Sequence, residues 1–229
     1  LKDAGVRAEF LTKEDASEYI DRYFAMDFTH KTLSMNNFKV DEECVRMGDR
    51  KCKIFSLVDV DSINLPSLVR PFANIEVNNT QMPVDVMAAI DQIPEARTVV
   101  YNQMIFIPNQ KRELALLEKK KNRHASIPNP GNQMAVEDIK QVQEVMAREG
   151  KQLVYTHYNL VVCCDSDADL QKPTNHLENT FGRMGVHISK RAYNQLELFV
   201  NSFPGNCYGM SAEYDRFLTL GDAAACLMY

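Results

Sequence analysis

Few residues in this chain have the type and spacing that catalysis needs. A phosphate-binding P-loop places a glycine-rich turn before a lysine, which is followed by a hydroxyl residue that holds magnesium. The sequence has a single Gly-Lys pair, Gly150-Lys151, in which Gln152 replaces the hydroxyl residue and Val145 stands where the first glycine is needed. We interpret this segment as the end of a helix, and expect no ATP or magnesium site within residues 1–229.

The histidines do not form a metal-binding pattern. They lie at positions 30, 124, 157, 176 and 187, without the spacing of a zinc site. Two interpretations of His157 stay open: a half-exposed histidine on the polar face of a strand, or a titrating group in the cleft of a self-contained enzyme. In an enzyme, the acidic cluster Asp165, Asp167 and Asp169 would be its partner, whereas the simpler role of these carboxylates is at a helix entry. We assign no catalytic, cofactor-binding or metal-binding residue.

One segment, residues 110–124, is strongly basic. Against Glu113 and Glu118 it carries six cations, which give it a local charge of +4: Lys111, Arg112, Lys119, Lys120, Lys121 and Arg123. Three leucines in the same segment predict a helix with a solvated cationic face. Contact with nucleic acid or an anionic membrane through this face is the alternative. The acidic whole chain, and the lack of aromatic residues among the cations, disfavour a dedicated nucleic-acid-binding module.

The composition is that of an ordinary globular protein. Hydrophobic residues make up 45% and charged residues 25%, the net charge is −5, and no run of about 20 apolar residues could span a membrane. The six cysteines show no C-x-x-C spacing, which is typical of reduced thiols in a cytoplasmic protein. Residues 223–229 have the pattern of a helix cut in mid-course, so we expect a fragment of a longer polypeptide.

Hydrophobic periodicity predicts the elements that position these residues. Helices are expected at 13–28, at 84–90 behind Pro83, and at 110–124, 135–149, 170–184 and 192–203. Strands are expected at 51–60, at 98–107 with both faces buried, at 153–164 as the central strand, and at 186–189, while 29–50 and 61–82 are irregular. This pattern is typical of an α+β fold, a small mixed sheet with helices packed on it and alternating strand-helix order in the C-terminal half.

Two clusters of proline and glycine mark breaks in the pattern. The first, residues 128–132, divides an expected N-terminal lobe, 1–131, which ends with the basic helix, from a C-terminal α/β lobe, 132–229. The second is Phe203-Pro204-Gly205-Asn206, which we interpret as a structural turn. Phe203 extends the apolar stripe of the preceding helix, Pro204 cannot continue it, and Gly205 can adopt the positive φ of a sharp reversal.

Several stretches of the C-terminal half resemble TraG-type conjugation-system ATPases of conjugative transposons, which are similar to the large ATPases of type IV secretion systems. The stretches are Tyr101-Asn102-Gln103, His157-Tyr158-Asn159-Leu160-Val161-Val162, Phe203-Pro204-Gly205-Asn206 and residues 217–227. The resemblance is good from about residue 99 to residue 229 and thinner before.

The resemblance implies a cytoplasmic ATPase, peripheral to the inner membrane, that powers channel assembly or DNA transfer. In that family the nucleotide-binding loop follows the region matched here, so ATP and magnesium are expected for the full-length protein and not for this fragment. No catalytic residue carries over, and the C-terminal lobe, with its turn at Phe203-Pro204-Gly205-Asn206, would lead toward the missing ATPase motor. The implied role is a non-catalytic N-terminal docking and assembly domain, whose partners are other conjugation-channel proteins, inner-membrane components and further copies of the full-length chain.

Overall fold

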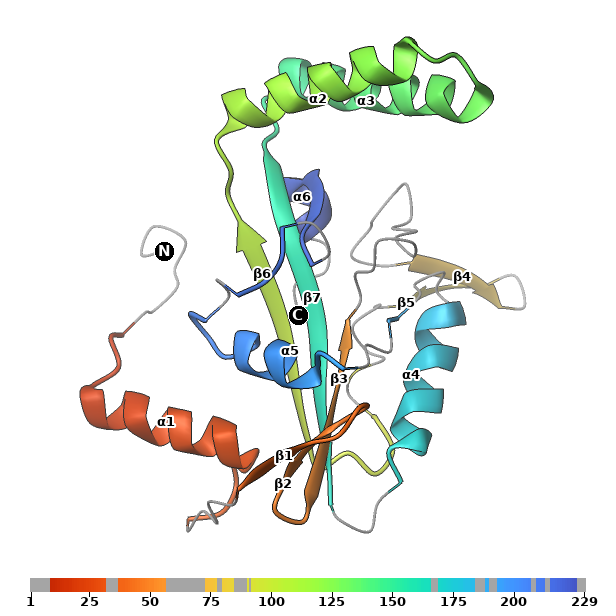
Figure 1. The fold of residues 1–229 in the computed structure, drawn as a ribbon. Helices are drawn as coiled ribbons and strands as arrows, with labels where there is room; N and C mark the ends of the chain where they lie inside the picture. The colour runs from red at the N-terminus through yellow and green to blue at the C-terminus, as the bar shows by residue number, and fades with distance from the viewer. Residues whose placement is uncertain are drawn as a thin grey trace.

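The computed structural model describes residues 9–31, 37–56, 73–77, 80–84, 90, 92–165, 169–183, 188–189, 193–206, 209–212 and 215–225. The elements in chain order are α1 (Lys13–Ala25), β1 (Phe38–Val40), β2 (Val45–Met47), β3 (Arg50–Ser56), β4 (Ala73–Val77), β5 (Thr80–Val84), β6 (Thr98–Phe106), α2 (Gln110–Ala125), α3 (Pro130–Glu149), β7 (Leu153–Cys164), α4 (Gln171–Arg183), α5 (Gln195–Asn201), β8 (Phe217–Leu220) and α6 (Gly221–Ala225) (Figure 1).

The main sheet is built around β7. This strand pairs with β3 and β6 on its two sides and with β8 near its start, while β2 and β1 continue the sheet beyond β3. The register places Cys52 opposite Cys163 and Phe106 opposite Tyr155. β4 and β5 form a separate two-stranded sheet. The predicted α+β class is confirmed, and all pairs between described strands are antiparallel, not mixed.

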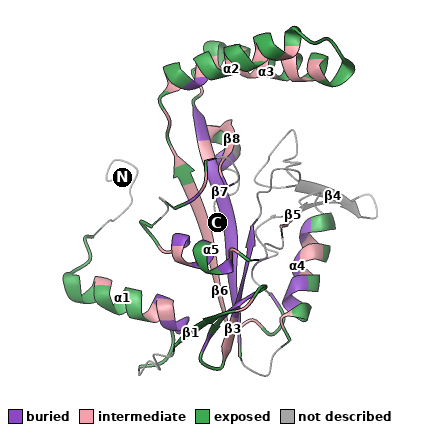
Figure 2. Ribbon diagram, in the orientation of Figure 1, coloured by how far each residue is buried: buried purple, intermediate pink, exposed green. Residues whose placement is uncertain are grey.

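Both faces of β7 are covered by hydrophobic side chains, as the continuous burial along this strand shows (Figure 2). On one face, α1 and α5 contribute Tyr23 and Phe199 to a cluster with the sheet. On the other face, Leu177 and Phe181 of α4 pack against a second cluster. β7 also lies between β3 and β6 in the sheet and is buried over nearly its whole length. The prediction of a central strand at 153–164 is therefore confirmed.

Helix α1 is defined by its caps. Thr12 and Asp15 form a reciprocal capping box at its start. The helix ends at Ala25, three residues earlier than expected, because Met26 adopts the left-handed conformation with φ of 47°. The backbone N–H of Met26 still donates to helix carbonyl groups, which satisfies the helix end.

A buried carboxylate ties the end of α1 to the sheet. Asp27 is 3% exposed and accepts hydrogen bonds from the backbone N–H groups of Thr29 (3.2 Å) and His30 (3.1 Å). It also forms ion pairs with Arg50 of β3 (3.1 Å) and with Arg97 (3.5 Å), which directly precedes β6. Burial alone would raise the pKa of Asp27, but the hydrogen bonds from His30, Thr29 and Arg50 outweigh it and hold this pKa well below its ordinary value. The network therefore joins α1 to strands on both sides of β7.

One glutamine joins α5 to β3. The fully buried side chain of Gln195 accepts a hydrogen bond from the backbone N–H of Ile54 (2.8 Å) and donates one to its carbonyl oxygen (3.0 Å). A single amide side chain thus pairs with both backbone groups of one residue, as a neighbouring strand would. This contact spans 141 positions in the sequence.

Helices α2 and α3 form a hairpin that extends past the ends of β6 and β7 (Figure 1). Asn109 and Asn129 cap the two helices, and Gly150 ends α3 with φ of +67°. The pairing of Phe106 with Tyr155 means that the hairpin is inserted between two neighbouring strands. The helices predicted at 110–124 and 135–149 are confirmed, although α3 begins five residues earlier, at Pro130.

The first proline and glycine cluster, residues 128–132, forms the end of the turn between α2 and α3 and the first residues of α3. Strands from both sides of residue 131 pair in one sheet, since β3 and β6 precede it and β7 follows it. The main sheet is therefore not divided at residue 131. The division into lobes at 1–131 and 132–229 stays a prediction.

Several expectations for the N-terminal half are wrong. β1, β2 and most of the β4–β5 hairpin lie in segments expected to be irregular. Pro83 lies within β5 and does not begin a helix, and a two-stranded sheet tolerates it because each strand has a free edge. β6 is half-buried and pairs only with β7 among the described strands, so it is an edge strand and not buried on both faces.

Other elements differ in length. The strand expected at 51–60 is described as Arg50–Ser56, and residues 57–60 and 85–89 lie outside the described part. The helices expected at 170–184 and 192–203 are the shorter α4 and α5. Of the strand expected at 186–189, residues 186 and 187 are not described, and Ser189 forms an isolated bridge with Ser56.

Candidate functional site

The start of α2 is fixed to the start of β7 by two polar side chains. The amide of Gln110 donates to the carbonyl oxygen of Leu153 and accepts from its backbone N–H, both at 2.8 Å. One turn later, Glu113 is buried and accepts a hydrogen bond from the hydroxyl of Tyr155 (2.8 Å). Burial and the Glu113 carboxylate raise the pKa of Tyr155, so its hydroxyl remains a donor at neutral pH. These bonds set the direction in which α2 leaves the sheet.

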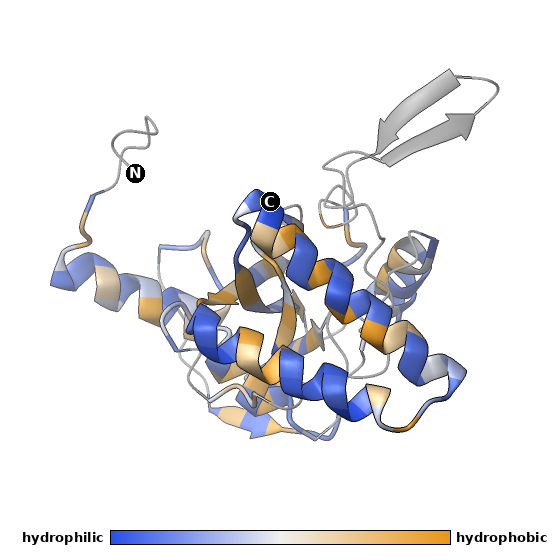
Figure 3. Cartoon of the chain, turned by 90° about the horizontal axis from the view of Figure 1, so that it is seen from above, coloured by the Kyte–Doolittle hydropathy of each residue, from blue (hydrophilic) through white to orange (hydrophobic). Residues whose placement is uncertain are grey.

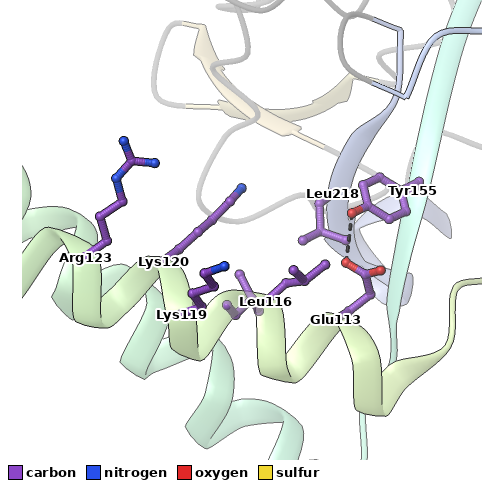
Figure 4. A pocket seen from close by; sticks show the side chains of 8 residues that line it. Glu113, Leu116, Lys119, Lys120, Arg123, Tyr155 and Leu218 are labelled. Carbon is purple, nitrogen blue, oxygen red and sulfur yellow. Dashed lines mark hydrogen bonds between the residues drawn. The ribbon is translucent and has the colours of Figure 1, made fainter.

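A hollow of about 170 Å³ lies between α2 and the sheet (Figure 4). Its wall on α2 follows helical spacing, and Tyr155 of β7 and Leu218 of β8 complete it. The α2 residues that line it are Glu113, Leu116, Leu117, Lys119, Lys120 and Arg123. Lys119, Lys120 and Arg123 lie farther along the helix than Glu113 and Leu116 (Figure 4). One end of the hollow is therefore cationic, and the other combines leucines with the hydrogen-bonded pair of Glu113 and Tyr155.

A second hollow, of about 290 Å³, lies beside the first and shares Leu117 and Leu218 with it. Its other lining residues come from α3 and the adjoining strands, and they are mostly apolar: Asp138, Ile139, Val142, Leu153, Thr219 and Leu220. The α2–α3 hairpin therefore leaves two adjoining apolar recesses where it meets β7 and β8.

The six predicted cations fall into three groups. Lys119, Lys120 and Arg123 line the first hollow, as described above. Lys111 and Arg112 are exposed but do not line it. Lys121 is half-buried and pairs with Glu118 (2.6 Å) and Gln143 of α3 (3.1 Å), so it holds the hairpin together. The single solvated cationic face predicted from the sequence is thus divided, and one of its members has a structural contact.

His157 is part of the protein interior. Its side chain is fully buried, and Nδ1 lies 2.7 Å from the carbonyl oxygen of Asp215. The interpretation of His157 as a half-exposed strand histidine is therefore wrong, and the alternative of a self-contained enzyme around this residue stays a prediction. The neighbouring Asn159 is also buried and accepts a hydrogen bond from Asn102 of β6 (3.1 Å). His157 and Asn159 lie on a face of β7 that is more polar in sequence, but the packing of other segments over this face buries both side chains.

Asp165, the first residue of the acidic cluster, lies far from His157. Asp165 pairs with Arg97 (2.6 Å), and its separation of eight residues from His157 corresponds to about 26 Å of extended chain. Asp169 accepts a hydrogen bond from the backbone N–H of Gln171 at the start of α4 (2.9 Å), which confirms the helix-entry role for this residue. Asp167 lies outside the described residues.

The segment Phe203-Pro204-Gly205-Asn206 forms a compact turn after α5. The Phe203 ring lies 5.2 Å from that of Tyr23 and also contacts two other aromatic rings of α1. Gly205 has φ of +85°, the positive value expected from the sequence. The turn is closed by the backbone N–H of Asn206, which donates to the carbonyl oxygen of Phe203 (2.9 Å). The expectation that this turn leads toward an ATPase motor stays a prediction.

No group of three or more His, Cys, Asp or Glu side chains in the described part of the chain could hold a metal ion. The four described cysteines, Cys44, Cys52, Cys163 and Cys164, are free thiols, as predicted. Burial raises the pKa of Cys164 to about 11, so this thiol is protonated and unreactive at neutral pH. Within the residues that the structure covers, no helix is both long and apolar enough to cross a membrane.

The sequence pattern of a family described as TraC protein matches residues 1–207. The chain belongs to this family, and therefore to the proteins of conjugative transfer and type IV secretion. The narrower resemblance to TraG-type ATPases stays a prediction. No curated protein matches the chain.

Proposed function

We propose that residues 1–229 form a non-catalytic docking and assembly domain of a conjugative-transfer ATPase that powers channel assembly or DNA transfer. In this proposal a motor outside the chain, of the TraG-type that the sequence resembles, binds ATP and magnesium. The domain connects that motor to other channel proteins and to inner-membrane components, on the cytoplasmic side of the membrane. Membership of the TraC family supports the transfer system as the setting.

The observation that carries the proposal is the contrast between the core and the hairpin. The best catalytic candidate of the sequence, His157, is fully buried in the core and lies far along the strand from Asp165. The two recesses described above lie instead where the α2–α3 hairpin meets the sheet; both have apolar walls, and the first carries three cations at one end. Such recesses suit contact with another macromolecule, because hydrophobic pockets with a charged border are the usual anchor points of protein interfaces.

Calorimetric titration of the chain with Mg-ATP tests the non-catalytic role. We expect no heat of binding, because the sequence has no loop that combines clustered backbone N–H groups with a lysine and a magnesium-holding hydroxyl. Binding with micromolar affinity would refute the proposal and would return attention to an enzyme. An intact folded sample, verified by circular dichroism, is the necessary control.

A further inference from the structure

We propose that the hollow between α2 and the sheet binds an acidic amphipathic helix of a partner protein. The partner would place one or two apolar side chains against Leu116, Leu117 and Leu218, and its carboxylates against Lys119, Lys120 and Arg123. The inference deepens the docking role proposed above and rests on it, since it specifies the chemistry of the partner that this domain recognises.

The volume of the hollow suits one side chain of a partner protein better than a free small molecule. Pockets for small ligands usually measure about 300–1,000 Å³, whereas a buried cavity of about 150 Å³ is enough for one benzene ring. The 170 Å³ hollow therefore has room for an aromatic or branched aliphatic side chain. The adjoining 290 Å³ recess, which shares Leu117 and Leu218, can receive a second side chain. Because the two recesses adjoin, one face of a helix can supply a side chain to each, from positions i and i+3 or i+4.

The charge of the rim selects an acidic partner. In the described part of the chain, no ion pair engages Lys119, Lys120 or Arg123, so their charges are available to a carboxylate. Glu113 is the acidic member of the lining, and it lies at the opposite end with its hydrogen bond to Tyr155. Ten residues of helix separate it from Arg123, about 15 Å, which exceeds the screening length of about 8 Å at physiological salt.

The surroundings of the hollow disfavour a membrane or a nucleic acid as the occupant. α3 lies beside α2 (Figure 3). Four of its acidic residues are exposed: Glu137, Asp138, Glu144 and Glu149. A flat bilayer or a DNA backbone that reached the α2 cations would lie close to these carboxylates. It would also leave the recesses unfilled, whereas a helix placed along α2 fills them.

The hairpin itself is incompletely covered. No residue of α3 is buried, and Glu113 is the one buried residue of α2 (Figure 2). Leu116 keeps 42% of its surface exposed at the mouth of the hollow. A partner helix would remove this apolar surface from water, which is the main source of free energy in such contacts.

The test is fluorescence anisotropy with a labelled synthetic peptide. The peptide is helical, with leucines at i, i+4 and i+7 and glutamates on the flanks, and a matched peptide carries lysine in place of each glutamate. We expect saturable binding of the acidic peptide that weakens with salt, and none of the lysine peptide. The double variant Lys120→Glu/Arg123→Glu should weaken binding at least tenfold, and Leu116→Asp should do the same.

Matched controls separate the hollow from general electrostatics. Lys111→Glu/Arg112→Glu makes the same change of charge on the same helix, outside the lining, and should leave the Kd within twofold. Circular dichroism and the melting temperature verify that each variant folds. Equal weakening by both double variants, or no binding of the acidic peptide, would overturn the proposal. So would binding of phosphatidylglycerol vesicles or duplex DNA that depends on Lys120 and Arg123 while the peptide fails to bind.

These outcomes are distinct from those of the Mg-ATP titration. If the chain binds ATP and the peptide still maps to the hollow, the non-catalytic role fails and the docking site stands. If neither ligand binds, the non-catalytic role survives and the docking site is refuted.

Discussion

Replacing Gln195 with alanine should destabilise the fold strongly, although the change is remote from the hairpin. Both of its hydrogen bonds to Ile54 are buried, at 2.8 and 3.0 Å. In the variant, the backbone N–H and carbonyl of Ile54 lose these partners in the interior. Each buried group left unsatisfied costs about 1–3 kcal/mol, so the free energy of unfolding should fall by about 2–6 kcal/mol. For a domain of this size, each kcal/mol lowers the melting temperature by about 2–4 °C.

Urea unfolding monitored by circular dichroism measures this loss. Gln141→Ala is the matched control, because Gln141 is an exposed residue of α3 and its replacement should shift stability by no more than about 0.5 kcal/mol. The dependence on urea should keep its slope, since the surface exposed on unfolding hardly changes. If Gln195→Ala proves as stable as Gln141→Ala, then water or a rearranged backbone satisfies Ile54 and the reasoning fails.

Two further changes test the attachment of α1. Asp27→Asn should lower the free energy of unfolding by about 2–3 kcal/mol at pH 7, less than the 3–5 kcal/mol for a fully buried pair, because Arg50 and Arg97 are partly exposed. The pKa of Asp27 is lowered in the folded state, so the stabilisation from its carboxylate is complete above the ordinary carboxyl pKa of about 4. This stabilisation is lost progressively as the pH falls from that value toward the pKa of the folded state. Urea titrations at pH 7, 4 and 3 should therefore show a flatter dependence of stability on pH in the variant. Phe203→Ala should cost about 2–3 kcal/mol in the same assay, below the value for a fully buried ring because Phe203 is half-buried. A Phe203→Ala protein as stable as the parent would instead make this turn a partner-binding epitope.

The sequence predicts the long regular elements well and the short ones poorly. β7 alternates apolar residues on one face over twelve positions, and α3 has an apolar stripe from Val136 to Met146, so the period of each element is clear. β1 and β2 have three residues each, too few to show any period. Pro83 is a good first residue for a helix, but its place in a two-stranded sheet depends on pairing with β4, which local pattern does not encode.

The site is predictable on one side only. The spacing of the leucines and cations indicates the face of α2 that lines the hollow, and this could be read from the sequence. The opposite wall comes from Tyr155 and Leu218, which lie 42 and 105 positions beyond Glu113, so only the fold brings them there. His157 shows the same dependence on the fold. Alternation along the strand identifies the polar face on which His157 lies, but it does not predict that distant Asp215 packs against this side chain.

Because the hairpin is inserted between β6 and β7, the sequence of its helices can change independently of the strands of the sheet. The chain leaves the sheet after Phe106 and returns to it next to the same position, at Tyr155. Lengthening, shortening or rewriting the intervening helices therefore shifts no strand register and uncovers little of the core. The partner-binding surface proposed above can therefore diverge in this segment while the strands that support it stay unchanged. One scaffold can thus serve transfer systems whose components differ.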